Sequence, residues 1–181
     1  MAKLIRAVAW RRLERPYTRK SKYREKAFIR AVPNCKIVKY VMGNSKKDFE
    51  YTILLKPKTD IQIRHNALES ARKTSNKILE KQATRANYKF RIRKFPHHVL
   101  RNNPLAAGAG ADRMSTGMKH SFGKTVGIAA QCRKGEPVIE IQVNKQHVEL
   151  AKKAANRARY KFACDCSIEV IKNPVVENTT A

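Results

Sequence analysis

The chain has 181 residues, 42% of them hydrophobic, which is enough for one domain with extensions. Forty lysines and arginines outnumber fourteen aspartates and glutamates, and the net charge is +26. Such a surface repels itself unless a polyanion neutralises it, and RNA or DNA is the usual one. No apolar run approaches the ~18 residues of a membrane span, so no membrane partner is expected.

The first thirty residues form a basic arm with eleven cations and two acids. A net charge of +9 opposes a self-standing core, so we expect the arm to order only on a partner. Its start resembles a transit peptide, but the basic stretch continues to residue 30, which favours a retained nucleic-acid-binding arm. The cations assigned to RNA binding are Arg11, Arg12, Arg19, Lys20, Lys22, Arg24, Lys26 and Arg30.

Four aromatic residues alternate with these charges: Trp10, Tyr17, Tyr23 and Phe28. Such rings can stack on bases or sugars while the cations hold phosphates. They can equally pin the arm to the body of the protein. Both interpretations stay open at this point.

Strand and helix patterns follow the arm. Residues 35–42 and 51–56 are rich in β-branched and aromatic residues, and Ile61 and Ile63 indicate a further short strand. Residues 66–86 have an apolar face at helical spacing and predict a helix.

Residues 87–95 alternate strictly between apolar and basic side chains. Lys89, Arg91 and Arg93 therefore share one face of a predicted strand, about 6–7 Å apart. That spacing suits the phosphates of a nucleic-acid strand, so these three residues are predicted to bind RNA. A merely solvated sheet face is the alternative.

The remaining pattern completes an α+β domain. Strands are predicted at residues 126–132, 138–143 and 167–171, with a second helix at 145–159. Strands interleaved with only two helices favour an α+β sandwich with a mixed or antiparallel sheet. We expect one domain at residues 31–173 and a polar tail at 174–181.

Catalytic and metal-binding patterns are weak. The four cysteines, Cys35, Cys132, Cys164 and Cys166, lack paired zinc-ligand spacing and indicate reduced thiols of a cytosolic protein. Gly108 and Gly110 fit neither a dinucleotide fingerprint nor a P-loop. Carboxylates are few and dispersed, which disfavours a metal nuclease or an acid–base pair. We therefore expect no metal, no cofactor and no enzymatic activity.

Residues 101–124 form a long glycine-rich connection between predicted strands. Connections of this length are uncommon in compact domains and are usually functional or disordered. Small residues allow backbone N–H groups to approach phosphates closely.

The segment from residue 96 to 124 closely resembles the signature of the L-ten-e family of archaeal and eukaryotic large-subunit ribosomal proteins, the counterpart of bacterial L-sixteen. The run that carries this is G-A-D-R-M-S-T-G-M-K-H-S-F-G-K. Likeness extends to R-P-Y-T-R in the arm, I-R-A-V-P-N-C-K-I after it and E-S-A-R-K-T-S-N-K in the first helix. The arm and tail resemble the archaeal branch.

The resemblance implies a sandwich of the hammerhead type in the cytoplasmic ribosome. It implies a structural protein that binds rRNA near the peptidyl-transferase region, beside other large-subunit proteins. The loop at 101–124 would face the A-site and P-site tRNAs and help position them. Loop residues matched to this role are Arg101, Gly108, Gly110, Arg113, Met114, Lys119, His120 and Lys124. An RNA-modifying or RNA-processing enzyme is the alternative function, and a free DNA-binding regulator is disfavoured because no recognition-helix pattern is present.

Overall fold

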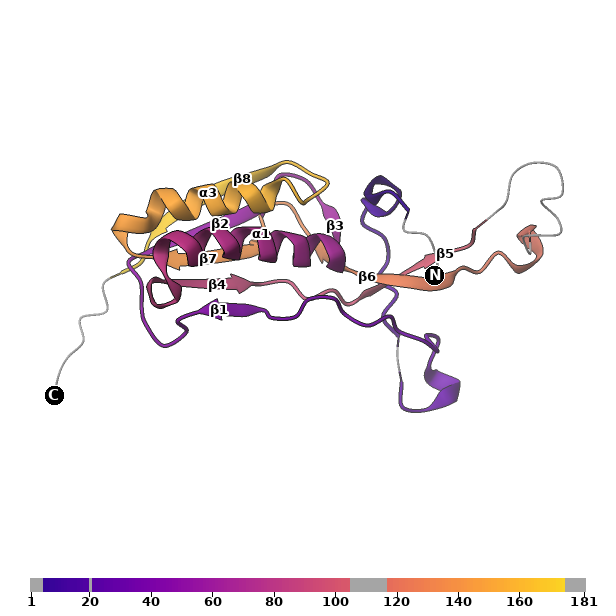
Figure 1. Ribbon diagram of the computed structural model, residues 1–181. Helices are drawn as coiled ribbons and strands as arrows, with labels where there is room; N and C mark the ends of the chain where they lie inside the picture. Colours follow the sequence, from indigo (N-terminus) through magenta and orange to yellow (C-terminus); the bar gives the residue numbers. More distant parts are fainter. Residues whose placement is uncertain (1–4, 20, 105–116, 175–181) are drawn as a thin grey trace.

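A five-stranded sheet backed by two helices makes up the body of the protein, and a three-stranded sheet projects from one end (Figure 1). The computed structural model describes residues 5–19, 21–104 and 117–174. The larger sheet has the strand order β1-β4-β7-β2-β8, and the smaller one β3-β6-β5. The predicted α+β class is confirmed, while the hammerhead type stays a prediction.

The strand bounds follow the alternation of the sequence closely. The five-stranded sheet contains β1 (Val41–Gly43), β2 (Tyr51–Pro57), β4 (Tyr88–Ile92), β7 (Ile139–Val143) and β8 (Cys166–Lys172). The three-stranded sheet contains β3 (Ile61–Arg64), β5 (His98–Asn102) and β6 (Lys124–Cys132). Every pairing between these strands is antiparallel.

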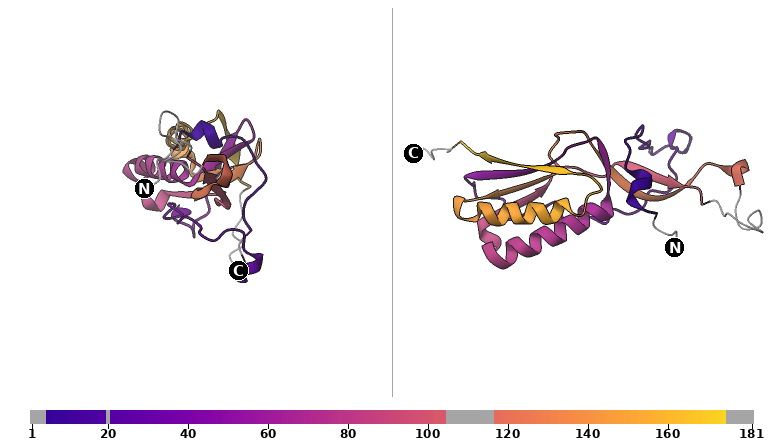
Figure 2. Two further views of the ribbon diagram at one scale, coloured as in Figure 1. Left: turned by 90° about the vertical axis from the view of Figure 1, so that its right-hand side faces the viewer. Right: turned by 90° about the horizontal axis from the view of Figure 1, so that it is seen from above.

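The core lies between the helices and one face of the larger sheet. Phe90 of β4 is opposite Ile141 of β7, which is opposite Ile53 of β2, and all three are fully buried. Because side chains alternate along a strand, the residues between them point to the other face, which neither of the two described helices covers (Figure 2). One face of the sheet thus packs against the helices, and the other carries mainly polar and charged side chains, with Leu54 buried among them.

The two helices are α1 (His65–Ala83) and α3 (Val148–Arg159), with short 3-10 turns at Arg85–Asn87 and Lys145–His147. Both predicted helices are confirmed, although α1 ends three residues early, where Thr84 takes a φ of 60°. Alanines on the inner face of α3 let the helices approach closely. Ser75 of α1 donates a hydrogen bond to the Ala154 carbonyl across this contact, at 2.8 Å. In the part of the chain described here, no helix is long and apolar enough to cross a bilayer.

The strand predicted at 35–42 is wrong for most of its length. The ladder with β4 covers Val41–Gly43, and the Tyr40 carbonyl just before it accepts a hydrogen bond from the Ile92 N–H at 2.8 Å. The residues before it are held by side chains of α1: the Lys36 N–H donates to Nδ1 of His65 and the Val38 N–H to Oε2 of Glu69, both at 3.3 Å. These tertiary hydrogen bonds replace the sheet ladder that strand propensity suggested.

The long connection is shorter than predicted. Arg101 and Asn102 belong to β5, which the sequence did not indicate, and Lys124 begins β6. Residues 117–120 form a 3-10 turn. The register steps from Leu100 opposite Gly127 to Arg101 opposite Thr125, so Val126 is the extra residue of a bulge.

The basic arm lies along both edges of the three-stranded sheet. The Gln62 N–H on β3 donates to the Arg11 carbonyl, and the Val99 N–H on β5 donates to the Tyr17 carbonyl, both at 3.0 Å. Ile29 is buried against Val99 and Ile128. The arm therefore contacts the body through main-chain hydrogen bonds to sheet edges rather than through a core of its own, and its ordering on a partner stays a prediction.

His98 anchors this contact. Its ring is only 4% exposed, and Nδ1 accepts a hydrogen bond from the Tyr17 N–H at 2.8 Å. Burial lowers the pKa of His98; Glu14, whose carboxylate lies 4.0 Å from Nε2, opposes the shift and Arg101 adds to it. A second buried histidine, His65, also has a lowered pKa, chiefly through burial. Both rings are therefore neutral acceptors in the folded protein.

Gly43 provides a test of the β1 edge. It has a φ of 86°, and an added Cβ would lie 2.1 Å from the Tyr88 carbonyl oxygen. We expect Gly43→Ala to lower the free energy of unfolding by about 3 kcal/mol in urea titrations. Gly135→Ala, at a φ of 79° but in open space, is the control and should cost about 1 kcal/mol. Equal losses in the two variants would contradict the close approach to Tyr88.

The buried histidines predict that acid destabilises the fold. Since their folded-state pKa values lie below the unfolded value of about 6.5, the unfolded chain binds more protons. Their stabilisation is complete above pH 6.5 and is lost as the pH falls through the folded-state pKa values. The free energy of unfolding, measured between pH 7.5 and 5, should decrease. His98→Gln should weaken this dependence and the neighbouring exposed His97→Gln should not; a full dependence in His98→Gln would refute the role of His98.

Candidate nucleic-acid interface

The docked arm presents its cations to solvent. Arg11, Arg12, Arg19, Lys22, Arg24, Lys26 and Arg30 are all exposed, and Lys20 lies outside the described residues. None of these seven forms an ion pair with an acid in the described ranges. The main chain is held by the sheet while the charged ends remain free, which is an arrangement suited to phosphates.

The arm's aromatic rings divide between the two roles that the sequence left open. Trp10 packs under the Arg64 guanidinium, whose carbon lies 5.6 Å from the ring centroid, and Tyr17 contacts the hairpin of β5 and β6. Tyr23 and Phe28 are instead 62% and 58% exposed. Two rings therefore pin the arm, and two are free to stack on a ligand.

The exposed rings each lie beside cations. Lys22 and Lys26 lie 5.9 and 5.6 Å from the centroid of Tyr23, and the Arg19 guanidinium carbon lies 4.6 Å from that of Phe28. A positive group beside an exposed aromatic face is the combination that binds a base and its phosphate together.

The three cations predicted on one face of β4 differ in exposure and in pairing. Tyr88, Phe90 and Ile92 are buried, as the alternation predicts, and Arg91 is exposed on the uncovered face of the sheet with Lys89 half-buried beside it. Arg93 lies past the end of the strand, where its guanidinium donates to Glu140 at 3.2 Å.

Glu140 also lies opposite Arg91 in the sheet register and accepts a hydrogen bond from Gln142 at 2.8 Å. Part of the cationic charge on this face is thus already balanced within the protein. The sequence could not show this, because Glu140 is about fifty residues away and reaches Arg93 only through strand pairing.

At the base of the hairpin, Arg101 lies against two aromatic rings. Its guanidinium carbon is 4.2 Å from the centroid of Tyr17 and 4.6 Å from that of Phe122. The rings themselves meet edge to face at 6.1 Å. Gly123 allows this packing, because an added Cβ would lie 2.8–3.1 Å from backbone atoms of Asn102. The arm, β5 and the turn before β6 are thereby joined through one arginine.

The other residues assigned to the loop are only partly described. Lys119 and His120 are exposed in the 3-10 turn, and Lys124 is exposed at the start of β6. Gly108, Gly110, Arg113 and Met114 lie outside the described residues. Among the loop residues that the structure describes, Arg101 contacts the arm, through the ring of Tyr17.

The thiols form no recognisable metal site. Sγ of Cys164 and Sγ of Cys166 are 3.7 Å apart, and burial raises the pKa of Cys132 to about 12. Within the described ranges, no three histidine, cysteine, aspartate or glutamate side chains gather in a way that could hold a metal ion.

Known proteins resemble this chain over most of its length. The family described as "Ribosomal protein L16p/L10e" matches residues 14–169. The large ribosomal subunit protein uL16 of Methanococcus maripaludis is 48% identical over 155 residues, which cover 86% of this chain and 90% of that protein. The uL16 proteins of Archaeoglobus fulgidus and Hyperthermus butylicus are both 44% identical. Their matches cover 90% of each chain in the first case, and 92% of this chain and 88% of the relative in the second.

The matched span includes residues 14–30 of the arm, both helices and most of β8. These relatives are archaeal and are named as ribosomal proteins, which form a structural rather than an enzymatic family. The resemblance read from the glycine-rich signature is confirmed: the chain belongs to the ribosomal protein L16p/L10e family, in its archaeal form.

Proposed function

We propose that this protein is a structural constituent of the large ribosomal subunit that binds rRNA near the peptidyl-transferase region. Family membership supports large-subunit rRNA and other ribosomal proteins as its partners. The observation that carries rRNA binding is the arm, whose main chain is fixed to both edges of the small sheet while its exposed cations lack acidic partners among the described residues.

The rRNA-binding residues in this proposal are the arm cations together with Lys89, Arg91 and Arg93. Arg91 is the exposed centre of the β4 group, and Arg93 would have to exchange Glu140 for a phosphate. We therefore expect the arm to contribute more to affinity than β4, because its cations give up no ion pair on binding.

The second part of the proposal is that residues 101–124 help position A-site and P-site tRNA. Support comes from the family signature in this segment and from the way it is mounted. The two strands that flank it, β5 and β6, project away from the helical body (Figure 1). Arg101, Tyr17 and Phe122 stiffen its base. A rigid base with small residues beyond it suits close approach to a bulky RNA ligand.

Neutralising the arm tests the rRNA contact. Replacing Arg19, Lys20, Lys22 and Arg24 with alanine should weaken binding to large-subunit rRNA. It should also reduce the slope of log K against log salt by about 0.9 for each lost phosphate contact. The measurement is filter binding across a series of potassium chloride concentrations. The control replaces Lys47, Lys58, Lys134 and Lys145, four exposed lysines elsewhere. An arm variant whose slope equals that of the control would show that the arm contacts something else.

Exchanging the loop tests the tRNA role. A glycine–serine linker of equal length in place of residues 105–116 keeps β5, β6 and the Arg101 cluster intact. We expect such subunits to assemble normally but to accommodate A-site tRNA more slowly, as measured by rapid-kinetics binding of aminoacyl-tRNA. A variant that unfolds or leaves the subunit would contradict this division of labour, and so would an unchanged accommodation rate.

A further inference from the structure

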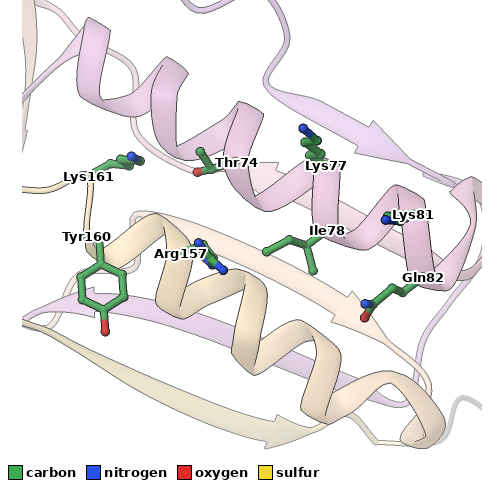
Figure 3. Close-up of a pocket in the computed structure, with 8 residues that line it drawn as sticks. All are labelled: Thr74, Lys77, Ile78, Lys81, Gln82, Arg157, Tyr160 and Lys161. Carbon is green, nitrogen blue, oxygen red and sulfur yellow. The ribbon is translucent and has the colours of Figure 1, made fainter.

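A groove lies between α1 and α3, on the face of the sheet that the helices cover (Figure 3). Its volume is about 420 Å³. Four of its eight lining side chains are cations, and none is an acid: Lys77 and Lys81 come from α1, Arg157 from α3, and Lys161 from the turn after it.

The charges of this groove are not balanced within the described part of the protein. None of the four cations lies within 4.0 Å of a described carboxylate. The nearby acid on α1, Glu80, instead accepts a hydrogen bond from Asn76 at 3.2 Å. Four cations that line one groove without acidic partners repel one another, and a bound polyanion relieves that repulsion.

The rest of the groove also suits a nucleic acid. Ile78 forms a half-buried apolar floor between the helices (Figure 3). Tyr160, just after the C-terminal end of α3, is 78% exposed, so the face of its ring is open to a base. Lys77 and Lys81 are one helical turn apart on α1, a spacing similar to that of successive phosphates along a strand.

We propose that this groove is a second RNA-binding site, in which the four cations hold the phosphate backbone and Tyr160 stacks on an unpaired base. The proposal rests on the proposed function in taking the RNA to be that of the large subunit. The cations favour a polyanion, and the exposed ring favours RNA over an acidic peptide because every base offers a face for stacking. The groove and the β4 cations lie on opposite sides of the five-stranded sheet, so they bind different RNA segments.

Neutralising the groove gives the first measurement. Lys77, Lys81, Arg157 and Lys161 are replaced together with alanine in the full chain, and binding to large-subunit rRNA is followed across a salt series. The slope of log K against log salt should fall by about 0.9 per phosphate contact, or roughly 3.6 units for four contacts. The four-lysine variant at Lys47, Lys58, Lys134 and Lys145 removes the same charge and should change the slope by less than one unit. All eight side chains are exposed, so thermal unfolding should match the wild type.

The stacking role has a separate readout. Tyr160→Ala should raise the Kd for rRNA about tenfold at every salt concentration and leave the salt slope unchanged, because a ring contributes no charge. Tyr160→Phe keeps the ring and should bind as the wild type does. Loss of affinity in both variants would assign the effect to the hydroxyl and would overturn stacking.

The outcomes separate this inference from the proposed function. A groove variant with the same slope as its control, while the arm variant still loses slope, overturns the groove alone. A wild-type chain that binds neither free rRNA nor the assembled subunit overturns the proposed function as well. A groove variant that binds free rRNA normally but is lost from assembled subunits shows that the occupant is an acidic segment of a neighbouring protein, which also overturns the RNA site.

Discussion

Repulsion among forty lysine and arginine side chains, with only fourteen acids to offset it, is the constraint that the whole structure accommodates. Two of the acids, Glu69 and Glu136, bind groups from separate segments of the chain. Glu69 binds Arg72 and the Val38 N–H and so ties the segment before β1 to α1. Glu136 binds Lys94 and the Arg133 N–H across two loops. Hydrogen bonds to these carboxylates, chiefly from Arg72 and Lys94, keep the pKa of each below its usual range. Among the described residues, most cations have no acidic partner within the protein, and a polyanion can supply one.

The arm shows how a strongly basic segment can be ordered without a core. Its charged side chains point outward, while its main chain meets the two edges of the small sheet through Gln62 and Val99. His98 completes the contact as a buried neutral acceptor, so the docking depends on protonation. The same contacts cover sheet edges that would otherwise be open to pairing with another chain. The main chain of the arm therefore contributes to stability, while its charged side chains remain available to bind a ligand.

Three cationic surfaces result, and the sheet separates them. The arm lies at the hairpin end, the β4 cations lie on the uncovered face, and the α1–α3 groove lies on the helical face. A protein with such surfaces on opposite sides fits between RNA segments rather than against one. The hairpin adds a projecting element whose base is fixed by Arg101 between Tyr17 and Phe122. This geometry supports the proposal that the protein joins RNA elements of the large subunit.

Sequence patterns alone determined what depends on local periodicity and composition: the α+β class, both helices, most strands, the inward face of β4, the excess of charge and the family signature. Tertiary structure decided which groups meet. Lys36 and Val38 are bound by His65 and Glu69 instead of a neighbouring strand, and β5 forms by pairing with β6. Arg93 forms an ion pair with Glu140. Packing of α1 on α3 places Lys77, Lys81 and Arg157 along one groove. Pairing between residues distant in the chain depends on register and helix packing, and no local pattern encodes it.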